Sequence, residues 1–150
     1  MAFVQAICAA YTQRGLSPAA ALAKAQIPEA LVADPAGRIT ANQMEWLSEA
    51  AMRELDDEAL GWFERRLPWG SYGMLARASL GATTLERALK RWCRHHGLLT
   101  GDIQLTLTQN GGWATLTLTE NRDLGALREF CLVSTLRNAH GLACWWVSSR

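Results

Sequence analysis

The chain has 150 residues, and fifteen Lys and Arg against fourteen Asp and Glu leave a formal net charge of +1. This length suits one domain with its own core, and 49% hydrophobic against 19% charged residues excludes a disordered chain. The near-neutral charge provides no general attraction to nucleic acid or to an acidic membrane. Seven tryptophans, against three phenylalanines and two tyrosines, indicate either a core of very large side chains or a pocket lined by them.

The cysteines and the N-terminus favour a cytoplasmic protein. Cys8, Cys93, Cys131 and Cys144 are widely spaced, and a chain of this length does not need disulfides, so we expect reduced and buried thiols. The first ten residues are largely apolar, but they are interrupted by Gln5 and lack the positive leader of a secretory signal. No apolar run approaches the ~20 residues that cross a bilayer, so we expect no contact with a membrane.

The first forty residues predict a series of short helices. An amphipathic helix ends at Gly15, where a C-terminal glycine is common. Ser17-Pro18 then starts an Ala-rich helix that ends near Gln26, because serine caps helices and proline suits the first helical position. One further helical turn is expected after Pro28.

The clearest helix start in the sequence is at Thr40. This residue and Gln43 form a capping box, and apolar residues recur behind them at helical spacing. The apolar stripe consists of Met44, Leu47, Ala51 and Leu55. Three more helices are expected, over residues 58–65, 74–80 and 85–95, the last of them stopped by Gly97.

The pattern changes to that of a β-hairpin after residue 101. Apolar residues alternate with polar ones over residues 103–108 and again over 114–119, and Asn110-Gly111-Gly112 lies between these segments. The alternation predicts one apolar face and one face rich in threonine. A helix over residues 123–138 and an interior strand over 142–147 are expected next, because Leu142–Val147 is apolar at successive positions.

These elements predict the α+β class: a helical N-terminal portion, then a β-hairpin, a helix and a further strand that form a small sheet. No segment has the composition of a long linker, so residues 1–150 are expected to form one domain.

The sequence contains no strong catalytic motif. Gly-rich phosphate loops and a GxSxG nucleophile motif are absent. The carboxylates of Glu54–Glu58 could act as an acid and base pair, but charged runs between helices more often face solvent. Cys93 and His96, with His140 and Cys144, have spacings that could form a zinc site, although buried cysteine more often acts as a small apolar residue. We therefore expect no enzyme, no metal and no cofactor.

Aromatic and arginine side chains near loops are the candidates for a ligand pocket. The aromatic ones lie in or beside a glycine-rich stretch or at the start of a strand, where such side chains often line pockets, but core packing is an equally common use. The arginines could hold a ligand carboxylate through two hydrogen bonds. The candidate ligand-binding residues are Trp62, Arg65, Trp69, Tyr72, Arg77 and Trp113.

Motifs distributed along nearly the whole chain resemble one known family. They are Arg14-Gly15-Leu16, Ile27-Pro28, Asp34-Pro35 with Arg38-Ile39, Ala59-Leu60-Gly61, Gly73–Leu80 and Thr84–Leu89, followed by the strand pair. The pattern resembles the arabinose-binding-like N-terminal domain of AraC-type transcriptional regulators. The resemblance implies a domain that binds a small effector, self-associates and controls a C-terminal module of two helix-turn-helix units, which this sequence lacks.

Two functions are therefore expected as alternatives. The first is an effector-sensing domain that binds an amino acid, an organic acid or a fatty acid, forms a homodimer and contacts DNA only through the missing module. The second is a protein–protein interaction or dimerisation module without a small-molecule ligand, which would use exposed apolar or basic helix faces. The resemblance supplies no ligand-binding residues, so the candidate site depends on the chemistry of the side chains alone.

Overall fold

The computed structural model describes residues 1–148, and it confirms the α+β class. The chain divides into two compact units: Met1–Gly61 with Arg66–Trp69, and Trp62–Arg65 with the chain from Gly70 onward. That the whole chain behaves as one domain stays a prediction. Within the described residues, no helix has both the length and the apolar character needed to cross a membrane.

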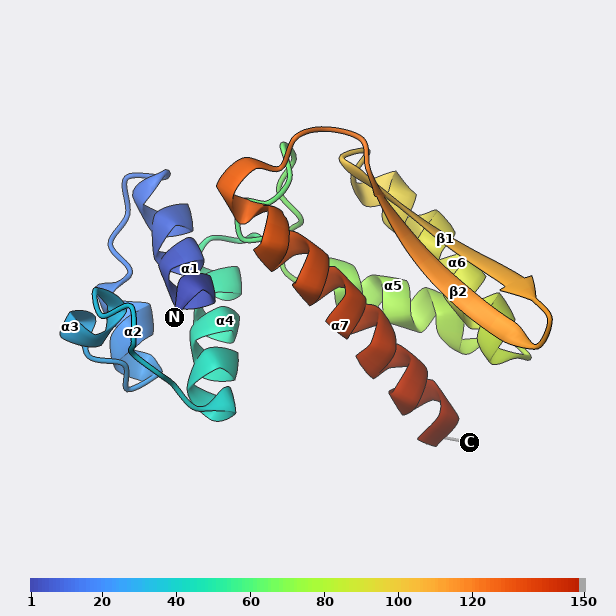
Figure 1. Cartoon of the computed structure of the whole chain (residues 1–150), viewed down its shortest axis with the longest axis horizontal. Helices are drawn as coiled ribbons and strands as arrows, with labels where there is room; N and C mark the ends of the chain where they lie inside the picture. The colour runs from blue at the N-terminus through green and yellow to red at the C-terminus, as the bar shows by residue number, and fades with distance from the viewer. Residues whose placement is uncertain (149–150) are drawn as a thin grey trace. The chain divides into compact units, whose positions relative to one another are not determined.

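The first unit is helical, as expected (Figure 1). Its helices are α1 (Ala2–Thr12), α2 (Ala19–Lys24), α3 (Glu29–Val32) and α4 (Ala41–Glu54). Helices α1 and α2 both pack against α4. The core of this unit includes Ile7 and Tyr11 from α1, Leu22 from α2 and Leu47 and Ala51 from α4. The two residues from α1 and the two from α4 are each four positions apart, so one face of each of these helices is covered by its neighbours.

The capping box at the start of α4 is confirmed. The Thr40 hydroxyl accepts from the Gln43 backbone N–H at 3.2 Å, and the Gln43 side-chain oxygen accepts from the Thr40 N–H at 3.0 Å. A cap of this kind typically stabilises a helix by ~1 kcal/mol. It is encoded within four residues, which is why the sequence alone identifies it.

The helix expected over residues 58–65 was a wrong prediction, because the segment forms turns and bends. Asp56 and Leu60 have φ values of 46° and 48°, in the left-handed region that interrupts a helix. Buried apolar residues at helical spacing, such as Leu60 and Phe63, suggested a helix. The same burial is achieved by a folded-back chain, whose backbone N–H groups are here satisfied by a carboxylate.

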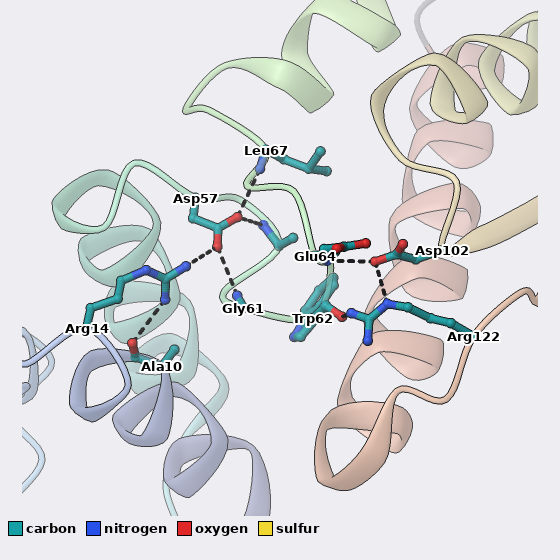
Figure 2. A network of polar contacts seen from close by, with 10 residues as sticks. Ala10, Arg14, Asp57, Gly61, Trp62, Glu64, Leu67, Asp102 and Arg122 are labelled. Atoms are coloured by element: carbon teal, nitrogen blue, oxygen red, sulfur yellow. Dashed lines mark hydrogen bonds and ion pairs between the residues drawn. The ribbon is translucent and has the colours of Figure 1, made fainter.

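The carboxylate of Asp57 organises this turn of the first unit (Figure 2). Its Oδ1 accepts from the N–H groups of Ala59 and Leu67, both at 3.0 Å, and its Oδ2 accepts from Gly61 at 2.9 Å. Arg14 donates to the same Oδ2 at 2.5 Å. The Asp57 residue is 0% exposed. A buried charge is stable only with such a set of donors, so the turn and the arginine depend on each other.

The second unit contains the β-hairpin and the remaining helices (Figure 1). Its elements are α5 (Ser71–Leu80), α6 (Leu85–Leu99), β1 (Ile103–Asn110), β2 (Trp113–Glu120), the short 3-10 helix η1 (Gly125–Leu127) and α7 (Arg128–Ser148). Helix α6 contacts α5, β1 and α7. The core of the second unit includes Leu75, Trp92, Leu105, Ala139 and Trp146, which come from α5, α6, β1 and α7.

The β-hairpin is confirmed, including its two faces. Leu105 pairs with Leu118, and Thr106 pairs with Thr117 in the next register position. Gly111 and Gly112 between the strands have φ values of 58° and 85°, which a type I′ turn requires and glycine adopts without strain. Local alternation and a two-residue turn therefore determine the hairpin register.

The strand expected over residues 142–147 was wrong, because these residues form the last part of α7. Trp146 is buried, seven positions after the buried Ala139, while Trp145 and Val147 are exposed. A short apolar run does not distinguish a strand from a helix by periodicity. The sheet therefore has two strands within residues 1–148, and α6 and α7 are both longer than expected, with Gly97 inside α6.

A second polar cluster, at the surface, lies within the second unit (Figure 2). Asp102 Oδ2 accepts from the Glu64 backbone N–H at 2.7 Å and from Arg122 Nε at 2.8 Å. Arg122 also donates to the Trp62 carbonyl oxygen at 2.8 Å. The segment Trp62–Arg65 is thereby attached to the start of the hairpin and to the loop that follows it.

His96 of α6 is buried among aromatic rings. The ring centroids of Trp92, Tyr72 and Phe63 lie 5.5, 5.9 and 6.0 Å from its imidazole. Its Nε2 is 3.4 Å from the Tyr72 hydroxyl oxygen, and its Nδ1 has no hydrogen-bond partner among the described residues. Burial lowers the pKa of His96 to about 4, because the charged form loses its hydration.

Replacing Asp57 by Asn removes the charge opposite Arg14 and one acceptor oxygen while it keeps the side-chain shape. We expect Asp57→Asn to lower the free energy of unfolding by about 3 kcal/mol, as measured by urea denaturation followed by circular dichroism. The control is Glu86→Gln, which removes an exposed ion pair with Lys90 and should cost less than about 0.5 kcal/mol. Similar losses in the two variants would contradict the central role of Asp57.

The buried His96 should make stability depend on pH in a defined window. Between its ordinary pKa of 6.5 and its folded pKa of about 4, the unfolded chain binds a proton that the folded chain does not. The stability from the neutral imidazole is therefore complete above pH 6.5 and is lost as the pH falls to 4. We expect the free energy of unfolding, measured by urea denaturation, to fall between neutral and acidic pH by about 2 kcal/mol more in the wild type than in His96→Phe. Equal losses in both proteins would show that His96 does not titrate in this way.

Candidate functional site

An open hollow on the surface of the first unit is the candidate ligand-binding site. Its volume is about 420 Å³, which is within the usual range for small-molecule pockets. It is lined by the end of α2, the residue Gln26 and one face of α4. The lining residues are Lys24, Gln26, Trp46, Glu49, Ala50 and Arg53. The four α4 residues stand at positions i, i+3, i+4 and i+7, so they lie along one side of the helix.

Two exposed tryptophans are associated with this hollow. Trp46 lines it and is 46% exposed, and Trp69 is 41% exposed. The guanidinium carbon of Arg53, another lining residue, lies 4.4 Å from the centroid of the Trp69 ring. The Trp69 backbone N–H donates to Asp56 Oδ1 at 2.9 Å, which holds the residue in place. Indole rings at the surface are available for stacking on a ligand or a cation.

The charges around the hollow are arranged as two ion pairs. Arg53 Nη2 lies 2.9 Å from Glu49 Oε1, and Lys24 Nζ lies 3.1 Å from Glu54 Oε1. Tyr11 donates to the other oxygen of Glu54 at 2.7 Å. Both ion pairs are exposed, and exposed pairs typically contribute only ~0–1 kcal/mol each. Their partners can therefore be exchanged for ligand groups at little cost.

The contact between Tyr11 and Glu54 changes the titration of both groups. Burial acts to raise the pKa of Glu54, but the hydrogen bonds from Tyr11 and Lys24 outweigh it and leave the pKa lowered. The pKa of Tyr11 is raised, first by burial and then by its bond to the carboxylate. Glu54 is thus an ionised anchor for Lys24 at neutral pH.

A second hollow of about 360 Å³ occurs in the same unit. It is lined by Met1, Ala2, Phe3, Val4, Ile39, Thr40, Ala41 and Met44. None of these side chains is charged. Because a ligand is oriented by convergent polar groups, we consider the hollow beside α2 and α4 the better candidate site.

The candidate residues from the sequence are distributed over both units, and their role in a site stays a prediction. Trp69 belongs to the first unit and stands beside the hollow through Arg53. Trp62 is buried in the second unit, with its ring centroid 5.1 Å from that of Phe130, as in a core packing contact. Tyr72 is half-buried against His96.

The remaining three candidate residues, all in the second unit, are exposed. Arg65 and Arg77 lie at the surface. Trp113 begins β2 and is 81% exposed, and the hairpin turn beside it lies toward the Leu85 end of α6 (Figure 1). Neither hollow described above is lined by these three residues or by Trp62, and their role in a site stays a prediction.

Sequence reasoning missed Trp46, Glu49 and Arg53, although a signal was present. The predicted apolar stripe of this helix is confirmed at Leu47 and Ala51, which are buried. Trp46 lies outside that stripe, so the helix presents a large aromatic residue on its polar side. A tryptophan on a polar face, followed by charges at helical spacing, indicates a binding surface rather than a core.

The cysteines are free, and they are distributed between core and surface. Cys93 and Cys131 are buried, and burial raises the pKa of each thiol to about 11. Cys8 is only half-buried. The expected burial was wrong for Cys144, which is exposed on α7 with its Sγ 3.7 Å from His140 Nε2. Residues 1–148 contain no group of three or more metal-ligating side chains, so the zinc arrangement suggested by the spacings is not formed.

Comparison with known proteins gives the family. The sequence model of one family, described as the N-terminal arabinose-binding domain of AraC transcription regulators, matches residues 15–150. The ornithine utilization regulator of Pseudomonas aeruginosa is 24% identical over 148 residues, which are 98% of this chain and 44% of that protein. The chain thus spans less than half the length of this relative, and no solved structure matches it significantly. Because the family match covers most of the sequence, the chain belongs to the N-terminal arabinose-binding domains of AraC transcription regulators.

Proposed function

We propose that this chain is the effector-sensing domain of an AraC-type regulator and that the hollow beside α2 and α4 holds the effector. The observation that carries the proposal is the grouping of Trp46, Lys24 and Arg53 around one open hollow. The charged side chains favour an amino acid or an organic acid over a fatty acid. The relative named for ornithine utilization supports an amino acid among these classes.

Binding in this hollow could change the first unit because two segments form it. Lys24 ends α2, whereas Trp46 and Arg53 lie on α4. A ligand that contacts both segments favours the arrangement in which they are correctly spaced. It shifts the population toward that arrangement by its difference in affinity for the two states. In the proposed regulator, this shift controls a DNA-binding module outside the present sequence.

The effector should stabilise the domain and change its tryptophan emission. A ligand at about 100 times its dissociation constant stabilises the folded state by ~2.7 kcal/mol, which corresponds to a rise in Tm of several degrees. We expect at least one member of a panel of amino acids, organic acids and fatty acids to produce both changes. Trp46→Ala should abolish them, whereas Glu45→Ala, at an exposed position of the same helix outside the lining, should retain them. If no class of compound changes either property, the sensing function is contradicted.

Self-association is a second candidate function, and it is compatible with the first. Helix α7 exposes large apolar side chains at Val133, Leu136, Trp145 and Val147. Val133 and Val147 are separated by about four helical turns, so they share one face with Leu136. Such an apolar face is a common site of contact between proteins, and we propose a second copy of this chain as the partner. We propose that the homodimer is cytoplasmic, because the cysteines are free and free thiols are typical of that compartment.

Sedimentation velocity over a wide range of protein concentrations tests the homodimer. We expect concentration-dependent dimers in the wild type and monomers in Leu136→Lys, because a buried lysine charge opposes the contact. Leu98→Lys, at an exposed position of α6, is the control and should dimerise like the wild type. A wild-type chain that is monomeric at all concentrations would contradict this function.

A further inference from the structure

We infer that the hollow beside α2 and α4 takes a dipolar ligand, one that carries both a carboxylate and an ammonium group, as a free α-amino acid does. This inference rests on the proposed function, since it names the ligand class for the same hollow. Three observations carry it: the geometry of Arg53, the balance of charge around the hollow, and the position of Trp46.

Arg53 has the geometry to receive a ligand carboxylate. Its Nε and Nη2 both contact one oxygen of Glu49, Oε1, at 3.0 and 2.9 Å. The pair therefore lacks the two parallel N–H to oxygen bonds of a matched guanidinium–carboxylate contact. Trp69 covers a face of the planar guanidinium and leaves its edge for hydrogen bonding. A ligand carboxylate could bind this edge through both of its oxygens.

Displacing Glu49 from Arg53 prepares the site for the ammonium group. Glu49 lines the hollow together with Trp46, which precedes it by three positions on the same face of α4. Once a ligand carboxylate occupies Arg53, the Glu49 carboxylate becomes an acceptor for a ligand ammonium. The exposed ring of Trp46 can stabilise the same cation through its electron-rich face.

The balance of charge around the hollow excludes singly charged ligands as good partners. Lys24 and Arg53 supply two cations, and Glu49 and Glu54 supply two carboxylates. A monocarboxylate that takes Arg53 leaves Glu49 as an unpaired negative charge beside it. A monoamine that takes Glu49 leaves Arg53 unpaired in the same way. A dipolar ligand satisfies both groups and keeps the sum of charges at zero.

The lining fits sugars and fatty acids less well. Its apolar surface comes from Trp46 and Ala50, which is too small to cover a long acyl chain. A neutral sugar carries no charge that could replace either partner of the Arg53–Glu49 ion pair. A short dipolar molecule matches both the size and the charges of the hollow.

The inference is tested by comparing amino acids with analogues that lack one or both of the charged groups. The probes are L-ornithine, L-norvaline, pentanoate, 1-aminobutane and L-arabinose, titrated into the 150-residue chain with tryptophan emission and Tm as readouts. We expect at least one of the two amino acids to bind, and the singly charged analogues to bind about tenfold more weakly or not at all.

Two substitutions on α4 identify the roles of the charges. Arg53→Gln should weaken binding of the amino acid about tenfold, because it removes the carboxylate contact. Glu49→Gln should weaken binding of the amino acid and reduce its advantage over pentanoate, which needs no ammonium acceptor. Glu45→Gln, at an exposed position of the same helix outside the lining, is the matched control and should bind like the wild type. Circular dichroism confirms that each variant is folded.

The outcomes separate the inference from the proposed function. If pentanoate, 1-aminobutane or L-arabinose binds as tightly as either amino acid and Trp46→Ala abolishes this binding, the dipolar class is overturned while the sensing role of the hollow stands. If an amino acid binds but neither Arg53→Gln nor Glu49→Gln weakens it, the site is elsewhere and the inference is overturned. If no probe binds, the inference is overturned, and the wider panel of effector classes decides the proposed function.

Discussion

The rest of the first unit depends on how the chain surrounds one buried carboxylate, that of Asp57. A charge without water is stable only when donors converge on it, and this one receives three backbone N–H groups and the guanidinium of Arg14. The need for these donors bends the chain after α4 instead of letting it continue as a helix. The same bend returns Leu67 to Asp57 and is followed by Trp69, which is tied to the neighbouring Asp56.

The turn around Asp57 is connected to the candidate site through Trp69 and Arg53. The Trp69 ring supports the Arg53 guanidinium, and Arg53 lines the hollow with Trp46. A buried and strongly paired carboxylate therefore holds the frame of the turn, while the groups that face the hollow are exposed and weakly paired. Such a division is suited to ligand binding, because the frame keeps its geometry when the exposed partners are exchanged.

Helix α4 connects the core to the site because its two faces differ. Leu47 and Ala51 are buried against the other helices of the unit, whereas Trp46 and Arg53 face the hollow. The capping box at Thr40 sets where the helix begins and so sets which residues lie on each face. In the second unit, α6 has a comparable structural role, since it packs against α5, β1 and α7 and buries Trp92 and His96.

The sequence by itself determined the features that depend on neighbouring residues: the capping box at Thr40, the apolar stripe of α4 and the register of the β-hairpin. Local hydrogen bonds and alternation within a few residues are sufficient for these. Only the tertiary structure decided that residues 58–65 fold around Asp57 and that residues 142–147 continue α7, because short apolar segments fit more than one element and burial selects between them. The candidate site also depends on the tertiary structure. Trp62 packs against Phe130, and Tyr72 packs against His96. The hollow is lined instead by Lys24 and Arg53, which lie close together because α2 packs on α4 and not because of their spacing in the chain.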